Sequence, residues 1–150
     1  MSEETPAAAP PPTTPKHLWI VGVLALLWNA MGAFDYLMTQ TQNEAYMGQF
    51  TPEQLEFFYG FPTWLVAFWA LAVWGSVAGS VLLLMRRRVA APVFLVAFAC
   101  MVVTAIHNYV FAGALEVVGT FGAVFSAVIF VCALALWLYA RAMVQRGVLQ

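Results

Sequence analysis

Six polar side chains interrupt the long apolar segments of this chain, and their types could support proton or ligand chemistry. A carboxylate such as Asp35 can exchange a proton or hold a cation, and a nearby imidazole such as His107 favours its charged form. Ionisable groups are costly where water is scarce, so each marks a candidate functional position. The candidates for a ligand or proton site are Asn29, Asp35, Tyr36, His107, Asn108 and Glu116.

The composition indicates that the segments around these residues cross a membrane. The chain has 150 residues, of which 63% are hydrophobic and 9% charged, whereas soluble domains carry about 25% charged residues. The apolar residues form four blocks, each near the roughly 20 residues that cross a bilayer as a helix. We therefore predict an all-α fold, a polytopic membrane four-helix bundle, without a separate soluble domain.

The ends of these blocks predict how the chain is organised. Residues 1–16 are rich in proline and carry two glutamates, so we expect a disordered cytoplasmic tail and a retained first span instead of a cleaved signal. A four-span membrane domain covers 17–140, and 141–150 form a second cytoplasmic tail. The expected spans are about 17–39, 62–85, 89–111 and 115–140, with a cap at 41–61.

The cap between the first two spans carries two helix start signals. Thr51 is followed by Pro52 and Gln54, a capping box with proline at the first helical position. Thr41 and Glu44 fit the same capping pattern. Each short helix that follows has one apolar face. We expect a short extracytoplasmic amphipathic helical cap, lying either on the membrane surface or as a lid over the bundle.

The basic residues predict the orientation. All six fall on one side of a four-span protein: Lys16 precedes the first span, Arg86, Arg87 and Arg88 follow the second, and Arg141 and Arg146 follow the fourth. The positive-inside rule makes that side cytoplasmic. We therefore expect a multi-pass membrane protein with cytoplasmic N- and C-termini. The arginine run is interpreted as a topology determinant, with binding of anionic lipid headgroups as a secondary role.

Helix geometry places several polar candidates at similar depth. Asn29 lies near the middle of the first span, and Asp35 lies about 9 Å further out at 1.5 Å per residue. His107 and Asn108 lie about 10 Å outside the centre of the third span by the same count. Our central hypothesis is a polar cluster near the outer mouth of the bundle. It would comprise Asp35, Tyr36, His107, Asn108 and Glu116.

Each candidate also has a purely structural interpretation. Asp35 could simply face interfacial water near a helix end, and Asn29 could join two helices. His107 and Asn108 could be a hydrogen-bonded pair that serves only packing. Glu116 in the first turn of the fourth span suits the helix dipole. No motif supports a haem or a metal site, so we expect no metal and no cofactor.

Small residues predict close helix packing at two places. Gly75 and Gly79 form a GxxxG motif in the second span, which lets two helix backbones approach. We expect this motif to pack within the chain in preference to a dimer seam. Gly119 and Ala123 begin a second track of small residues in the fourth span.

Part of the chain resembles a known group of proteins. The residues concerned run from Gly32 to Thr41, include Asn43 and Tyr46, and continue through Phe50 to Leu55 and Tyr59 to Pro62. They are similar to small four-span bacterial inner-membrane proteins of unassigned function, some of which bear a generic sugar-transporter label. The resemblance implies the same four-helix architecture and supplies no catalytic residues. No Pro-Gln motif, inverted half-repeat or broken helix at the midplane accompanies it, although many secondary transporters have such features.

These observations favour a small transport or permeation protein with an Asp/His site near the outer face. The alternative is a non-catalytic accessory or assembly subunit of a larger membrane complex. We expect no enzyme, because no nucleophile–base set or cofactor motif is present. The expected partners are the lipid bilayer and either a homo-oligomer or a larger membrane protein, and no nucleic acid.

The orientation yields a direct test. A cysteine introduced at Glu53 (Glu53→Cys) should react with a membrane-impermeant thiol reagent added outside the cell, because the cap is expected there. Labelling only from the cytoplasmic side would contradict this topology.

Overall fold

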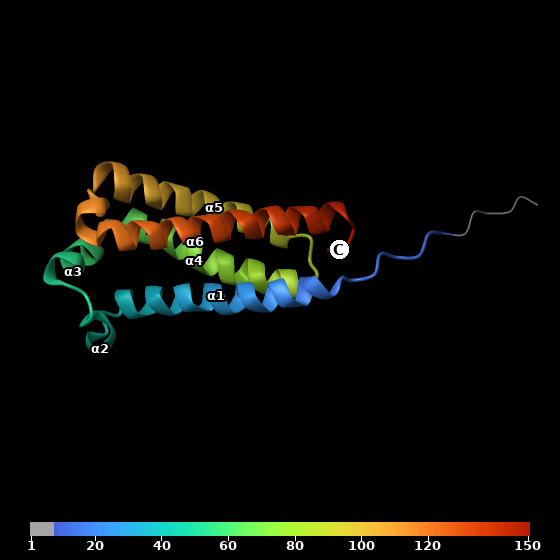
Figure 1. The fold of residues 1–150 in the computed structure, drawn as a ribbon, viewed down its shortest axis with the longest axis horizontal. Helices are drawn as coiled ribbons and strands as arrows, with labels where there is room; N and C mark the ends of the chain where they lie inside the picture. Colours follow the sequence, from blue (N-terminus) through green and yellow to red (C-terminus); the bar gives the residue numbers. More distant parts are fainter. Residues whose placement is uncertain (1–7) are drawn as a thin grey trace, which may run out of the picture.

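The computed structural model describes residues 8–150, and over this range every regular element is a helix (Figure 1). The part of the expected tail at 1–7 lies outside the described residues, and residues 8–15 form no helix. The elements are α1 (Lys16–Gln40), α2 (Glu44–Met47), α3 (Pro52–Tyr59), α4 (Thr63–Leu84), α5 (Ala90–Ile106), the π-helix η1 (His107–Phe111) and α6 (Ala114–Gln145).

Four of these helices are long and apolar enough to cross a membrane, which confirms the predicted membrane four-helix bundle. They are α1, α4, the continuous segment Ala90–Phe111 formed by α5 and η1, and α6. Each packs on the next in chain order, α1 on α4, α4 on α5 and α5 on α6 (Figure 1). The protein is therefore an integral, multi-pass membrane protein.

The closest helix pair is α4 with α5, and the GxxxG glycines lie in its interface. A Cβ atom at Gly79 would lie 2.7 Å from the ring of Phe94, and one at Gly75 would lie 3.1 Å from Cβ of Ala97. The motif therefore packs within the chain, as the sequence predicts. The absent side chains let the two backbones approach, which is how small residues stabilise helix pairs in membranes.

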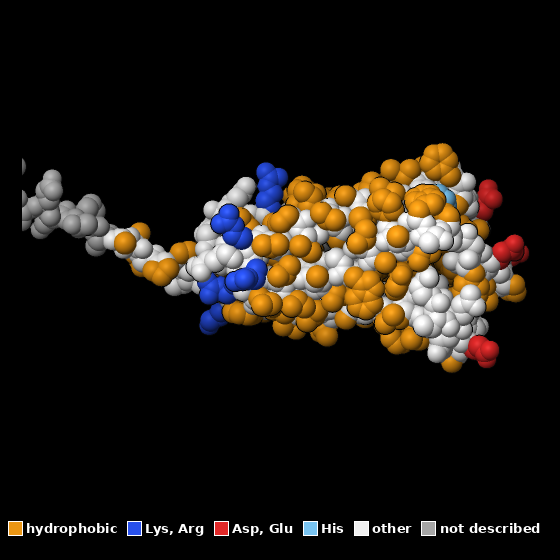
Figure 2. Space-filling model, turned by 180° about the vertical axis from the view of Figure 1, so that it is seen from behind, with side chains coloured by type: hydrophobic (Ala, Val, Ile, Leu, Met, Phe, Trp, Pro, Cys, Tyr) orange, Lys and Arg blue, Asp and Glu red, His pale blue; other side chains and the backbone are white. Residues whose placement is uncertain are grey.

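Charges divide the bundle into two ends (Figure 2). We call them the arginine end, which bears the Lys and Arg side chains, and the carboxylate end. The described acidic residues of the carboxylate end are Asp35, Glu44, Glu53, Glu56 and Glu116. Both short helices, α2 and α3, also lie at the carboxylate end (Figure 1).

The arginine end is closed by a compact apolar core. Leu18 of α1, Leu83 of α4 and Met143 of α6 are almost completely buried there, with Val148 and Leu149 packed against them. The backbone after α6 also pairs with the α4–α5 turn, because the N–H of Arg88 donates to the carbonyl of Gln150 and the N–H of Gln150 donates to the carbonyl of Arg86. The expected tail at 141–150 is thus partly helix, through Gln145, and partly core.

The backbone is irregular where α5 leads into α6 at the carboxylate end. The last turn of this span is the π-helix η1, Gly113 adopts the left-handed conformation, and Gly119 interrupts α6 with φ 67° and ψ −173°. Nothing lies within 4 Å of a Cβ placed at Gly119. The packing track expected at Gly119 and Ala123 therefore begins instead with a kink, in a backbone region that essentially only glycine occupies.

The cap consists of two short helices that form a lid at the carboxylate end. The predicted capping box of α3 is confirmed, since the Thr51 hydroxyl accepts from the N–H of Gln54 and the Gln54 side chain accepts from the N–H of Thr51. The prediction for α2 is wrong, because Asn43 caps that helix and the Thr41 hydroxyl donates back to the carbonyl of Leu37. The Gln54 side chain also donates to the carbonyl of Val117 at 3.3 Å, which ties the lid to α6.

The α4–α5 contact predicts the effect of a single methyl group. Gly79→Ala should destabilise the protein by about 1–3 kcal/mol, because the new methyl would overlap the buried ring of Phe94. Gly32→Ala is the matched control in α1, since nothing lies within 4 Å of its Cβ position. Thermal unfolding in detergent measures both variants, and equal melting temperatures would contradict the proposed tight contact.

Candidate functional site

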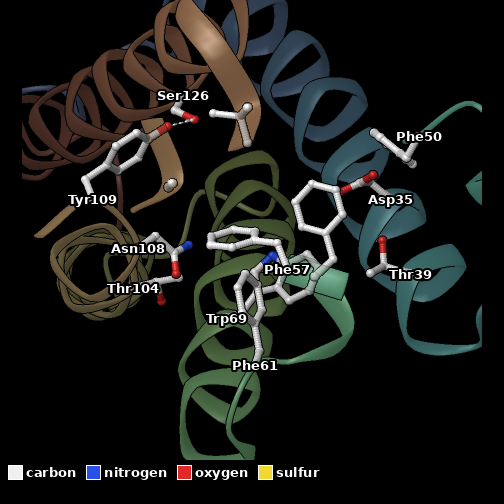
Figure 3. A pocket seen from close by; sticks show the side chains of 13 residues that line it. Asp35, Thr39, Phe50, Phe57, Phe61, Trp69, Thr104, Asn108, Tyr109 and Ser126 are labelled. Carbon is white, nitrogen blue, oxygen red and sulfur yellow. Dashed lines mark hydrogen bonds between the residues drawn. The ribbon is translucent and has the colours of Figure 1, made fainter. Parts of the chain in front are cut away.

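A cavity of about 200 Å³ lies beneath the lid at the carboxylate end (Figure 3). Side chains from all four long helices, from α3 and η1, and from the loops on either side of α3 line it. Its polar lining residues are Asp35, Thr39, Thr104, Asn108, Tyr109 and Ser126. Its aromatic lining residues other than Tyr109 are Phe50, Phe57, Phe58, Phe61 and Trp69. The site thus combines aromatic rings with polar side chains, of which one is a carboxylate.

The carboxylate of Asp35 is held by a hydrogen bond from the lid. The hydroxyl of Tyr46 in α2 donates to Oδ1 of Asp35 at 2.6 Å. Burial, and then the hydrogen bond and negative charge of Asp35, raise the pKa of Tyr46 to about 12. The phenol therefore keeps its proton at physiological pH and remains a donor to the carboxylate.

A chain of aromatic contacts joins the Asp35–Tyr46 pair to the roof and wall of the cavity. Ring centroids lie 6.2 Å apart for Tyr46 and Phe50, 5.3 Å for Phe50 and Phe58, and 6.4 Å for Phe58 and Phe61. Phe61 then meets Trp69 of α4 at 6.0 Å. All four pairs are edge-to-face, and such a pair contributes about 0.5–1.5 kcal/mol beyond the burial of its surface. The lid is therefore fixed to α1 and α4 by side chains as well as by its loops.

The opposite wall is built around the π-helix. Asn108 from η1 and Asp35 from α1 approach the cavity from opposite sides, with aromatic rings between them (Figure 3). The Oδ1 atom of Asn108 lies 3.2 Å from Nδ1 of His107, so the Asn108 amide nitrogen remains available to the cavity. A π-helical turn contains an extra residue, and such turns frequently occur at functional sites.

The structure brings two of the six predicted residues together at the cavity, Asp35 and Asn108. Tyr36 does not line it but packs edge-to-face on Trp69, which does, at 4.9 Å. His107 contacts Asn108 and packs against the ring of Trp64 at 5.3 Å, outside the lining residues. His107 therefore contacts the site only through Asn108 and does not contact Asp35.

Two predicted residues lie away from the cavity. The Glu116 side chain is exposed in the first turn of α6. Asn29 donates to Oγ of Ser80 at 2.9 Å and to the carbonyl of Ser76 at 3.3 Å. Both partners belong to α4, so Asn29 joins two helices near the middle of the bundle.

Sequence reasoning missed the aromatic part of the site. Phe57, Phe61 and Trp69 are not among the predicted site residues, because aromatic side chains are common packing residues in membrane spans. A signal was nevertheless present. Tyr46, Phe50 and Phe58 lie on the apolar faces of the lid helices and their loop, a short distance after a carboxylate at a span end.

Other ligand chemistry finds less support in the geometry. Among residues 8–150, no group of three His, Cys, Asp or Glu side chains lies close enough to hold a metal ion.

Comparison of the chain with protein-family models finds no match, and comparisons with curated proteins and with solved structures also find none. The chemistry of the site is therefore argued from its own residues.

The Asp35–Tyr46 pair predicts an alkaline titration signature. Tyrosinate absorbance of the detergent-solubilised protein should contain a component with a pKa of about 12, which Tyr46→Phe removes. Asp35→Asn should move this component toward lower pH, because it removes the negative charge that opposes ionisation of the phenol. Glu44→Gln is the matched control, as Glu44 is exposed on the same short helix and is not bonded to the phenol. An unchanged titration in Asp35→Asn would contradict the pairing.

Proposed function

We propose that this integral membrane protein is a small transport or permeation protein whose cavity receives a solute from outside the cell. The observation that carries the proposal is the unequal closure of the two ends. The carboxylate end holds a cavity of about 200 Å³, whereas at the arginine end Leu18, Leu83 and Met143 are almost completely buried in a packed apolar core. This arrangement corresponds to a solute pathway that is accessible from one side and sealed from the other.

The charge distribution supports the side from which the solute would enter. All described Lys and Arg side chains gather at the arginine end (Figure 2), and the positive-inside rule assigns such an end to the cytoplasm. The cavity would then face the periplasm of a bacterial inner membrane, with both termini in the cytoplasm. The described carboxylates at the entrance would attract cations and repel anions.

The irregular backbone next to the cavity supports a moving wall. Non-helical backbone within a membrane is tolerated where protein or a water-filled cavity surrounds it. Here η1, Gly113 and Gly119 provide three consecutive irregularities between α5 and the regular part of α6. The segment Ala114–Val118 between the two glycines contributes Ala114 and Val118 to the cavity lining. Rotation about the glycines would open or close this wall without disturbing the sealed end.

The exposed face of α6 supports assembly in two or more copies. Phe121 is 86% exposed, and Val124, Phe125, Val128 and Val131 are exposed on the same helix. A second copy that packs here would complete a pathway that one narrow four-helix bundle cannot enclose. The same face also fits the second candidate function, an accessory subunit whose α6 binds a larger membrane protein.

A permeation assay tests the proposal. Proteoliposomes should swell faster than protein-free liposomes after osmotic shock with at least one of glycerol, glucose, glycine or tetraethylammonium chloride. Asn108→Trp should abolish the difference, because the larger ring would fill the cavity. Glu56→Gln should retain it, since Glu56 is exposed and does not line the cavity.

The contrary result is equally specific. If proteoliposomes swell no faster than protein-free liposomes with any of the four solutes, permeation of these solutes is excluded. Purification in mild detergent with a second protein in fixed stoichiometry would favour the accessory subunit over a homo-oligomer.

A further inference from the structure

We infer that the cavity binds a small organic cation, an amine or quaternary ammonium that carries a hydrogen-bond acceptor a few bonds from its charge. The inference rests on the proposed solute site and names the chemical class of its occupant. Four properties of the cavity support it: its charge, its aromatic walls, the amide donor of Asn108 opposite Asp35, and its size.

The charge of the cavity selects cations. Asp35 is the single acidic side chain in the lining, and the lining contains no basic side chain. Among residues 8–150, the Tyr46 hydroxyl is the only hydrogen-bond donor to this carboxylate, and it occupies Oδ1 alone. The described Lys and Arg side chains lie at the far end of the bundle (Figure 2). A partly buried carboxylate without a cationic partner is costly, and a bound cation would offset that cost.

The walls favour an organic cation over a metal ion. Phe57, Phe61 and Trp69 come between Asp35 and Asn108 in the cavity (Figure 3). The faces of aromatic rings attract ammonium groups, with tryptophan the strongest, and aromatic cages recognise quaternary ammonium ligands. Calcium and magnesium instead require several oxygen ligands, and one carboxylate among aromatic rings does not provide them.

One polar group of the cavity suits the acceptor of the ligand. The Thr104 hydroxyl donates to the carbonyl of Cys100 at 2.9 Å, and the Tyr109 hydroxyl donates to Ser126 at 2.8 Å. The amide nitrogen of Asn108, on the side opposite Asp35 (Figure 3), is free to donate to a ligand. A cation with a single acceptor group would place its charge near Asp35 and its acceptor near Asn108.

The size of the cavity limits the ligand. Its volume of about 200 Å³ is below the roughly 300–1,000 Å³ typical of pockets for drug-sized molecules. Choline therefore serves as a suitable probe, because it combines a quaternary ammonium with one hydroxyl. Its neutral isostere 3,3-dimethyl-1-butanol has the same shape without the charge.

Calorimetric titration of the full-length protein in detergent tests the inference. Choline should bind, and 3,3-dimethyl-1-butanol should bind at least tenfold more weakly. Asp35→Asn should weaken choline binding about tenfold or more while it leaves the weak binding of the neutral alcohol unchanged. Glu56→Gln removes an exposed carboxylate from the same end of the molecule and should change choline binding less than twofold. That control separates direct pairing with Asp35 from the general negative field.

Equal binding of choline and the neutral alcohol would overturn the cation inference and leave the solute site standing. No binding of choline would also overturn it, and faster liposome swelling with glycerol or glucose would then still support the proposed function. If Asp35→Asn does not fold, the comparison of choline with its neutral isostere on the parent protein decides the matter alone.

Discussion

A hydrogen bond from the phenol of Tyr46 to the carboxylate of Asp35 anchors the lid to the first helix of the membrane bundle. It lies where α1 leaves the apolar region, at a point where a carboxylate would otherwise lose much of its hydration. The bond fixes α2 against α1, and Tyr46 then begins the aromatic contacts that continue through Phe50 and Phe58 to Trp69. Together with the hydrogen bond from Gln54 to Val117, this attachment holds two short helices of twelve residues in total over the cavity.

The architecture could be predicted from sequence because it follows from one strong constraint. A bilayer requires each crossing segment to be long, apolar and helical, so the four blocks and the charge bias define the bundle. Local chemistry predicted the α3 capping box at Thr51 equally well, because two start signals coincide at that position. The predicted cap of α2 at Thr41 is wrong, because Asn43 caps that helix. Thr41 and Asn43 can both cap a helix, and only the path of the chain after α1 decides which one does.

The site was predictable only in part, because it depends on the direction in which each side chain points around its helix as well as on its depth in the membrane. Helix rise placed Asp35 and Asn108 at similar levels, and both line the cavity. His107 immediately precedes Asn108 in the chain, but its ring packs against Trp64. Rotation around a helix axis changes at a π-turn, and such a turn cannot be read from composition. Gly119 shows the same difficulty, since a glycine in an apolar helix favours either packing or a kink, and the surrounding chain determines which.

The packing order of the spans has a consequence for how the protein assembles. Each long helix packs chiefly on a long helix that is its neighbour in the chain, so most contacts join segments that are near one another in sequence. Such local topologies fold quickly and can form progressively as the chain emerges from the ribosome. The lid is one exception, because Gln54 bonds to Val117, more than sixty residues later in the chain. The cavity is therefore complete only once α6 is in place and the lid has its second anchor.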